Sequence, residues 1–284
     1  MAQDRRPAYE GRSLPRPDEE VVDQGLGFDL GTLMSRRRLL RGFGLGAAAI
    51  GLAACSSNSS SDTPAVSSGE IPEETAGPYP GDGSNGPDVL EQSGVVRSDI
   101  RSSFGTGSGT AEGVPMTLEL TILDVANDSK PFAGAAVYVW HCDRAGQYSM
   151  YSEAVRNENY LRGVQIADDS GKVTFTSIFP ACYTGRWPHV HFEVYPGQAD
   201  ITDATRTIAT SQVALPKETS EAVYATAGYE SSVTTLAQVS LDSDNVFGDD
   251  SGARQLGTVT GDVTNGYAVA LTVRVDTTTT PTGG

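Results

Sequence analysis

The residues best suited to chemistry in this 284-residue chain are its histidines, because the chain has only three of them. His189 and His191 form a His-x-His pair around Val190. Side chains two positions apart on a β-strand point to the same face, so this pair could bind one metal ion while Val190 faces the opposite layer. The pair alone is weak evidence, since two surface histidines on a strand would give the same pattern.

Two tyrosines and an arginine accompany the pair. Tyr183 and Arg186 lie just before it in the stretch YTGRWPH, which ends at His189. Tyr148 ends the stretch WHCDRAGQY, which begins at Trp140. Each has an ordinary alternative: tyrosines at strand ends usually pack and hydrogen-bond, and an arginine can form a surface ion pair.

The order and spacing of these stretches resemble those of the intradiol ring-cleavage dioxygenases, the family of catechol and protocatechuate 3,4-dioxygenases. In that family one Tyr follows a Trp-His pair and a glycine. A second Tyr follows a strand that begins after a Gly and ends in Ile-x-Pro, and Arg-x-x-His-x-His comes soon after. The matching stretches here are WHCDRAGQYS (140–149), GKVTFTSIFP (171–180) and RWPHVH (186–191).

The resemblance extends beyond the central motifs, over about residues 72–275. It includes ETAGPY (74–79), which resembles a segment near the start of the family's domain. It also includes VRSDI (96–100) and LRGVQ (161–165), which resemble the secreted, single-domain members.

The resemblance implies a ferric ion, Fe(3+), and four ligands to it: Tyr148, Tyr183, His189 and His191. Phenolate oxygen is a hard, anionic donor, and a bound cation favours the deprotonated form of a phenol whose free pKa is about 10. In the family the Tyr nearer the histidines is displaced by the substrate, and here that is Tyr183. Zinc or copper is an alternative, but two Tyr ligands argue against these softer ions.

The implied reaction inserts O2 between the two hydroxylated carbons of a catechol-type aromatic and gives a muconate-type diacid, as in the catabolism of aromatic compounds. Arg186 would stabilise negative charge that develops on the ring. Gln212 resembles a family glutamine near the ring, although it lies further from His191 in sequence than expected. Tyr79 would line the pocket mouth. The preferred substituents of the ring stay open among catechol, hydroxyquinol, protocatechuate and lignin-derived relatives.

The elements that position this site are short runs in which apolar and polar residues alternate, with turn residues between them. Such runs predict strands over 117–125, 135–141, 173–178, 190–195 and 268–275. No long apolar pattern of helical period is present. We therefore expect an all-β, prealbumin-like β-sandwich of mostly antiparallel strands with long loops. Trp140 and its neighbours would belong to the core, and His141 would be structural.

Because a fold does not fix function, a second class of protein stays open. The stretch GAAV (134–137) also occurs in non-catalytic sandwich modules. The alternative is therefore a non-catalytic β-sandwich lipoprotein that binds aromatic or carbohydrate ligands. A burgundy colour would separate the two, since tyrosinate bound to ferric iron absorbs visible light.

The N-terminus has the features of an export signal. Residues 35–41 read SRRRLLR, and the Gly/Ala-rich run that follows ends before Cys55 after 13 residues, too short to span a bilayer. The paired arginines resemble a twin-arginine signal, and LAAC resembles a lipobox. We expect residues 1–54 to be a signal peptide and Cys55 to carry lipid. The protein would then be exported and anchored to the membrane by that lipid alone, or secreted if the lipobox is unused.

Domain boundaries follow from composition. A Ser-rich tether is expected over 55–71, the dioxygenase-like domain over 72–275 and a disordered Thr/Gly-rich tail over 276–284. The family's helical N-terminal region that joins two subunits has no counterpart here, so the oligomeric state stays open and includes a monomer. Whether Cys142 and Cys182 pair as a disulfide is also open, because sequence does not give their separation.

The net charge disfavours two classes of partner. The formal net charge is −16, which disfavours binding to nucleic acid and to anionic lipid through charge. The expected partners are therefore a catechol-type molecule and O2.

Overall fold

The computed structural model describes residues 8–9, 12–13 and 69–279. The chain divides into two units, residues 1–65 and 66–284. In the first, β1 (Ala8–Tyr9) pairs antiparallel with β2 (Arg12–Ser13). The expected lipid site, Cys55, most of the predicted signal and tether, and residues 280–284 lie outside the described residues.

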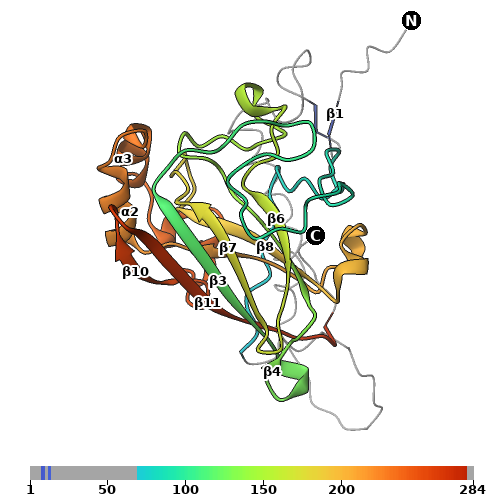
Figure 1. The fold of residues 1–284 in the computed structure, drawn as a ribbon. Helices are drawn as coiled ribbons and strands as arrows, with labels where there is room; N and C mark the ends of the chain where they lie inside the picture. The colour runs from blue at the N-terminus through green and yellow to red at the C-terminus, as the bar shows by residue number, and fades with distance from the viewer. Residues whose placement is uncertain (1–7, 10–11, 14–68, 280–284) are drawn as a thin grey trace, which may run out of the picture. The chain divides into compact units, whose positions relative to one another are not determined.

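In the second unit the described strands form two sheets, as expected for an all-β fold (Figure 1). One sheet has the order β10-β11-β3-β4, with β7 also paired to β3, and the other has the order β6-β5-β8-β9. Pairing is antiparallel except between β11 and β3, which run parallel. The first sheet contains β3 (Pro115–Asp124), β4 (Lys130–Pro131), β7 (Lys172–Ile178), β10 (Thr258–Asp262) and β11 (Gly266–Val275). The second contains β5 (Ala136–Trp140), β6 (Arg162–Ile166), β8 (His189–Tyr195) and β9 (Ala209–Ala214).

Helices are short in the described part of the chain, which explains why no helical period was found in the sequence. They are α2 (Lys217–Tyr224) and α3 (Glu230–Leu236), which lie next to each other outside the sheets (Figure 1). The 3-10 turns are η2 (Val125–Asn127), η3 (Glu153–Val155), η4 (Gln198–Asp200), η5 (Ala204–Arg206), η6 (Leu241–Ser243) and η7 (Phe247–Asp249).

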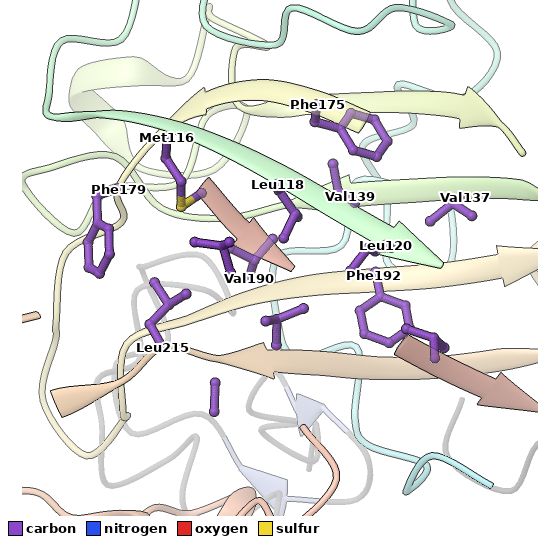
Figure 2. Packing of buried hydrophobic residues seen from close by; sticks show 14 of the residues in the cluster. Met116, Leu118, Leu120, Val137, Val139, Phe175, Phe179, Val190, Phe192 and Leu215 are labelled. Carbon is purple, nitrogen blue, oxygen red and sulfur yellow. The ribbon is translucent and has the colours of Figure 1, made fainter. Parts of the chain in front are cut away.

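The core lies between the two sheets, as the alternation in the sequence predicts (Figure 2). Leu118 and Leu120 of β3 pack with side chains from β5 and β8, and all are buried. Val190 belongs to this core, so the residue between the two histidines does face the opposite sheet. The five strands predicted from the sequence all form, with bounds that shift by at most two residues.

The other face of the β6-β5-β8-β9 sheet is also buried, unlike the solvated outer face of many antiparallel sheets. Every residue of β5 and of β8 is buried. The segment before β3 covers this face: the Tyr138 hydroxyl donates to the Pro80 carbonyl, and Val96 pairs with Val164 of β6. A second, polar layer is therefore enclosed between this sheet and its loops.

The ends of this unit pack more closely than the expected tether and tail suggest. The Ile71 amide donates to the Arg274 carbonyl, and Glu70 is buried. At the other end, Asp276 is buried and the Thr277 hydroxyl donates to Asp124. Residues 69–71 and 276–279 thus join the ordered unit.

Candidate metal centre and active site

The histidine pair begins β8 on its outer face. His189 and His191 are 2 % and 3 % exposed, and their Nε2 atoms lie 3.0 Å apart. Their ring planes are nearly perpendicular, at 79°. Two buried Nε2 atoms this close together are expected of histidines that bind the same metal ion, and not of two surface histidines.

Both candidate tyrosines join the pair. The Tyr148 Oη lies 3.3 Å from the His191 Nε2 and 3.5 Å from the His189 Nε2. The Tyr183 Oη lies 3.3 Å from the His189 Nε2 and 3.1 Å from the Tyr148 Oη. The structure therefore brings the four sequence-predicted ligands together in one cluster.

Loops rather than strands carry the two tyrosines, and local hydrogen bonds fix the loop that carries Tyr148. The Asp143 carboxylate accepts from the amides of Ala145 and Gln147 and so closes the turn before Tyr148. The Tyr148 amide donates to the Ser152 hydroxyl. Tyr148 is 2 % exposed, whereas Tyr183 is a half-buried residue. The two tyrosines therefore differ in how fully the protein encloses them.

The two imidazoles are oriented by different means. The His189 Nδ1 lies 2.5 Å from the Trp187 carbonyl, which fixes Nδ1 as the protonated atom and leaves the Nε2 lone pair for the cluster. The His191 Nδ1 is buried and has no hydrogen-bond partner among the described residues. Its ring instead stacks on Trp140, with centroids 4.8 Å apart and planes 7° apart.

Burial sets the charge state of the four groups in the absence of a cation. It lowers the pKa of both histidines well below the ordinary value, with further lowering by the Arg186 charge, so both imidazoles are neutral. Burial also raises the pKa of both phenols above the ordinary value. A bound cation would reverse the tyrosine shift and stabilise phenolate.

The cluster fits a single hard metal ion. The described residues hold no group of three or more His, Cys, Asp or Glu side chains that could bind a metal, so the tyrosines are needed to complete a ligand set. Donor atoms 3.0–3.5 Å apart are spaced as ligands that share one ion at about 2 Å. Two phenolate oxygens with two imidazoles favour ferric iron over softer ions.

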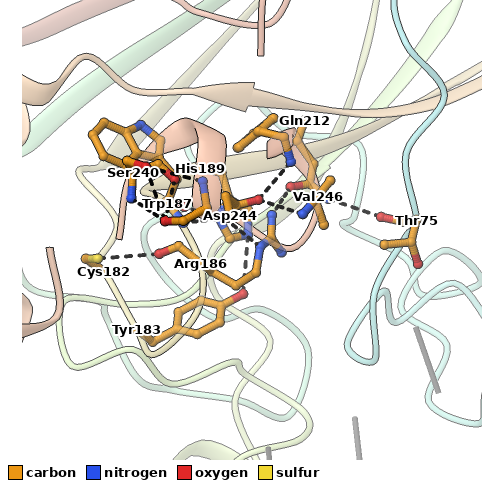
Figure 3. Close-up of polar contacts among 12 residues, drawn as sticks. Thr75, Cys182, Tyr183, Arg186, Trp187, His189, Gln212, Ser240, Asp244 and Val246 are labelled. Atoms are coloured by element: carbon orange, nitrogen blue, oxygen red, sulfur yellow. Dashed lines mark hydrogen bonds and ion pairs between the residues drawn. The ribbon is translucent and has the colours of Figure 1, made fainter. Parts of the chain in front are cut away.

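Arg186 lies beside the cluster and is firmly held (Figure 3). Its Nε donates to the fully buried Asp244 at 3.1 Å, and its guanidinium also donates to the Gln212 side-chain carbonyl. The Asp244 carboxylate accepts from the Trp187 amide as well. Burial lowers the pKa of Arg186, but Tyr183, Asp244 and Tyr148 raise it more, so the net pKa is above the usual value.

Gln212 is closer to the centre than its sequence position suggested. It lies on β9 directly opposite His191, so the two share a sheet face. Its side-chain amide donates to the Thr75 carbonyl at 3.1 Å (Figure 3). The distance between Gln212 and His191 in the sequence was misleading, because β9 runs antiparallel beside β8 and brings the two residues opposite each other.

Tyr79 also reaches the cluster. Its ring centroid lies 4.9 Å from that of Tyr148 and 5.3 Å from that of Tyr151. Tyr79 is partly exposed, which places it at the edge of the buried centre.

The remaining candidates lie outside the cluster. His141 uses both ring nitrogens, bonded to the Cys142 carbonyl and the Ser177 hydroxyl at 2.7 Å each. Cys142 and Cys182 are buried free thiols, so the open disulfide question is answered in favour of unpaired residues. Sequence reasoning missed Asp244, which orders Arg186. No local motif marks it, since it lies 58 residues further along the chain.

Fold and site together define a class, a β-sandwich whose enclosed polar face holds two tyrosines and two histidines. A family model described as "Dioxygenase" matches residues 85–199, which contain all four of these side chains and Arg186. Over 79 residues the chain is 33 % identical to catechol 1,2-dioxygenase of Candida albicans, covering 27 % of this chain and 26 % of that protein. Over 53 residues it is 38 % identical to chlorocatechol 1,2-dioxygenase of Rhodococcus opacus, covering 19 % and 21 %.

The chain thus matches only about a quarter of the length of these curated relatives. In fold it is similar to an intradiol ring-cleavage dioxygenase from Tetranychus urticae, with a TM-score of 0.59 and 22 % identity over 75 % of this chain and 98 % of that one. At that identity the likeness shows the fold. The resemblance to intradiol ring-cleavage dioxygenases inferred from the motifs is confirmed.

Proposed function

We propose that this protein is a non-haem Fe(III) intradiol dioxygenase that cleaves a catechol-type ring between its two hydroxylated carbons. The observation that carries the proposal is the convergence of Tyr148, Tyr183, His189 and His191, whose donor atoms are linked by five contacts of 3.0–3.5 Å. The matched family and the similar fold support it. Both oxygen atoms enter the product, a muconate-type diacid, so no external reductant is needed.

These four residues would hold the ion. When bound, ferric iron would supply a Lewis acid that stabilises the doubly deprotonated catechol and draws electron density from Tyr148 and Tyr183, which gives the colour. Tyr148 would be the phenolate that stays, because it is buried and its loop is closed by hydrogen bonds. Tyr183, a half-buried residue, would be the phenolate that gives way to the substrate. Its Oη would then accept one of the two catechol protons, and the other would pass to solvent.

Arg186 would act on the ring of the substrate, and Gln212 would hold Arg186 in place. The guanidinium is fixed by Asp244 on one side and by Gln212 on the other, so it needs no rearrangement when negative charge develops on the ring. Tyr79 forms an aromatic wall against which a flat substrate ring would pack.

Oxygen uptake by the iron-loaded protein with catechol tests the proposal. The wild type should be burgundy, consume one O2 per catechol and form a diacid. Tyr148→Phe and His191→Ala should lose iron or activity while the sandwich stays folded. A colourless wild type, or normal oxygen uptake in both variants, would reject the ligand assignment and leave an aromatic- or sugar-binding sandwich, or another metal.

We also propose that the protein is exported and anchored through lipid on Cys55. The support is the sequence order of paired arginines, apolar run and cysteine. None of the helices in the described part of the chain is long and apolar enough to cross a bilayer. Cys55→Ala should move the protein from the membrane fraction to the soluble fraction. Unchanged membrane association would contradict the lipid anchor.

A further inference from the structure

A second buried cation lies in the enclosed polar layer, and the proposed mechanism does not use it. Arg162 begins β6 and is 1 % exposed. Its Nε donates to the Ser149 hydroxyl, one terminal nitrogen donates to the Pro80 carbonyl and the Tyr138 hydroxyl, and the other donates to the carbonyls of Tyr79 and Ser149. These contacts, of 2.7–3.1 Å, use all five N–H groups of a guanidinium, and every acceptor is neutral.

Two of these acceptors lead directly to the proposed metal centre. Ser149 follows the buried ligand Tyr148, and Arg162 binds both its hydroxyl and its carbonyl. Tyr79 presents its ring to Tyr148 at 4.9 Å, and Arg162 binds its carbonyl at 2.9 Å. One guanidinium therefore sets the position of a ligand loop and of the aromatic wall relative to each other.

Strand pairing extends this arrangement across the sheet. Arg162 lies opposite Trp140, Trp140 lies opposite His191, and His191 lies opposite Gln212. These four residues form one transverse row on the outer face of the β6-β5-β8-β9 sheet. Trp140 stacks on His191, so the row links the guanidinium to a second proposed ligand.

A segment of the loop before β3 spans this row and is gripped at both ends. We call residues 75–80 the strap. Gln212 donates to the carbonyl at its start, Thr75, and Arg162 donates to the carbonyls at its end, Tyr79 and Pro80. Between the grips the strap passes close over His191, since a Cβ placed on Gly77 would lie 3.5 Å from the His191 Cε1.

A buried cation with only neutral partners is costly, because desolvation is not offset by an opposite charge. Arginine suits this place through its planar fork of five donors, and lysine, a point charge with three donors, cannot reproduce it. The geometry points to Arg162 as a positioning residue that holds the strap and the Tyr148 loop around the proposed ferric site. The effect of Arg162 on substrate binding rests on the proposed function, whereas its hydrogen bonds to the strap do not.

Arg162→Lys tests this inference, with Arg97→Lys as the matched control. Arg97 also donates to backbone carbonyls, those of Arg162, Ser102 and Asn159, but it contacts neither the strap nor a proposed ligand. Both variants should lower the melting temperature. Only Arg162→Lys should shift the visible tyrosinate band at full iron content and raise KM for catechol about tenfold, with kcat within about threefold.

Hydrogen exchange gives a readout that needs no iron. Amides of residues 75–81 should exchange about tenfold faster in Arg162→Lys and at the wild-type rate in Arg97→Lys. If the wild type binds no iron, the proposed function fails, and this measurement still decides whether Arg162 holds the strap. Wild-type exchange, band and KM in a folded Arg162→Lys would overturn the inference.

A milder pair covers the case in which Arg162→Lys does not fold. Tyr138→Phe removes one acceptor of Arg162 and one donor to Pro80 while it keeps the ring stacked on Trp140. Its control is Tyr229→Phe, whose buried hydroxyl donates to Phe179, away from the strap. Tyr138→Phe should speed exchange at 75–81 and raise KM about threefold, and the control should do neither. Equal behaviour of the two variants would overturn the inference.

Discussion

The two faces of β8 are equally buried and yet have opposite chemistry. The inner face carries Val190, Phe192 and Val194, which pack in the core without needing specific partners. The outer face carries His189 and His191, whose positions depend on a carbonyl and on a stacked indole. On one face burial itself is the stabilising interaction, and on the other each polar atom needs a partner, which makes the second face able to do chemistry.

The largest effect is expected on the outer face. His189→Ala removes one of four donors, so iron affinity should fall by more than about a hundredfold and oxygen uptake should disappear. The unfolding free energy of the iron-free protein should fall by about 1–3 kcal/mol, because the buried Trp187 carbonyl loses its donor. Iron content and urea unfolding measure the two quantities. Full iron content in the variant would contradict the assignment of His189.

The inner face should respond in the opposite way. Phe192→Ala leaves a cavity in the core and should cost about 3–5 kcal/mol of unfolding free energy. The fraction that stays folded should bind iron with wild-type stoichiometry, since Phe192 points away from the cluster. Loss of the visible colour in the folded variant would contradict the view that the inner face of β8 stabilises the fold without taking part in the iron site.

This contrast explains what the sequence could reveal. The inner face obeys a period of two, so β3, β7, β8 and β11 were found from apolar alternation. β9 was missed because its residues, ATSQVA, are small or polar and show no such alternation. Without β9 the pairing of Gln212 with His191 could not be seen, and sequence distance made that glutamine look remote.

The site shows the same limit of local patterns. Its four central side chains were predicted because they lie in short motifs with fixed spacing. Asp244, Arg162 and the strap act through contacts between distant segments. The separation is 58 residues from Arg186 to Asp244, 83 from Tyr79 to Arg162 and 137 from Thr75 to Gln212. Such contacts depend on loop paths and strand register, which no short motif contains.

His141 is a buried polar residue outside the proposed active site, and we expect it to make the stability of the protein sensitive to acid. Burial lowers the pKa of His141 from 6.5 to about 4. Between these values the unfolded chain binds a proton that the folded protein does not, so stability is lost as pH falls from about 6.5 towards 4. From pH 7 to pH 5 the iron-free protein should lose about 2 kcal/mol through this residue.

Urea unfolding of His141→Gln at both pH values checks this expectation. The variant should start less stable, because the bond to Ser177 is weakened, and its stability should depend less on pH. A pH dependence parallel to that of the wild type would show that another group titrates.

The smallest effect is expected from a pair of glycines that differ in whether backbone strain falls next to the site. Gly77 and Gly134 both have positive φ, +75° and +83°, so alanine at either should cost about 1 kcal/mol of stability. A Cβ at Gly134 meets nothing within 4 Å, whereas one at Gly77 would be in ordinary van der Waals contact with the His191 Cε1, at 3.5 Å. Because the backbone strain at Gly77 would be relieved next to this ring, only Gly77→Ala should shift the visible band of the iron-loaded protein. Identical spectra for two equally destabilised variants would mean that the strap does not restrain His191, and that stacking on Trp140 alone orients this ring.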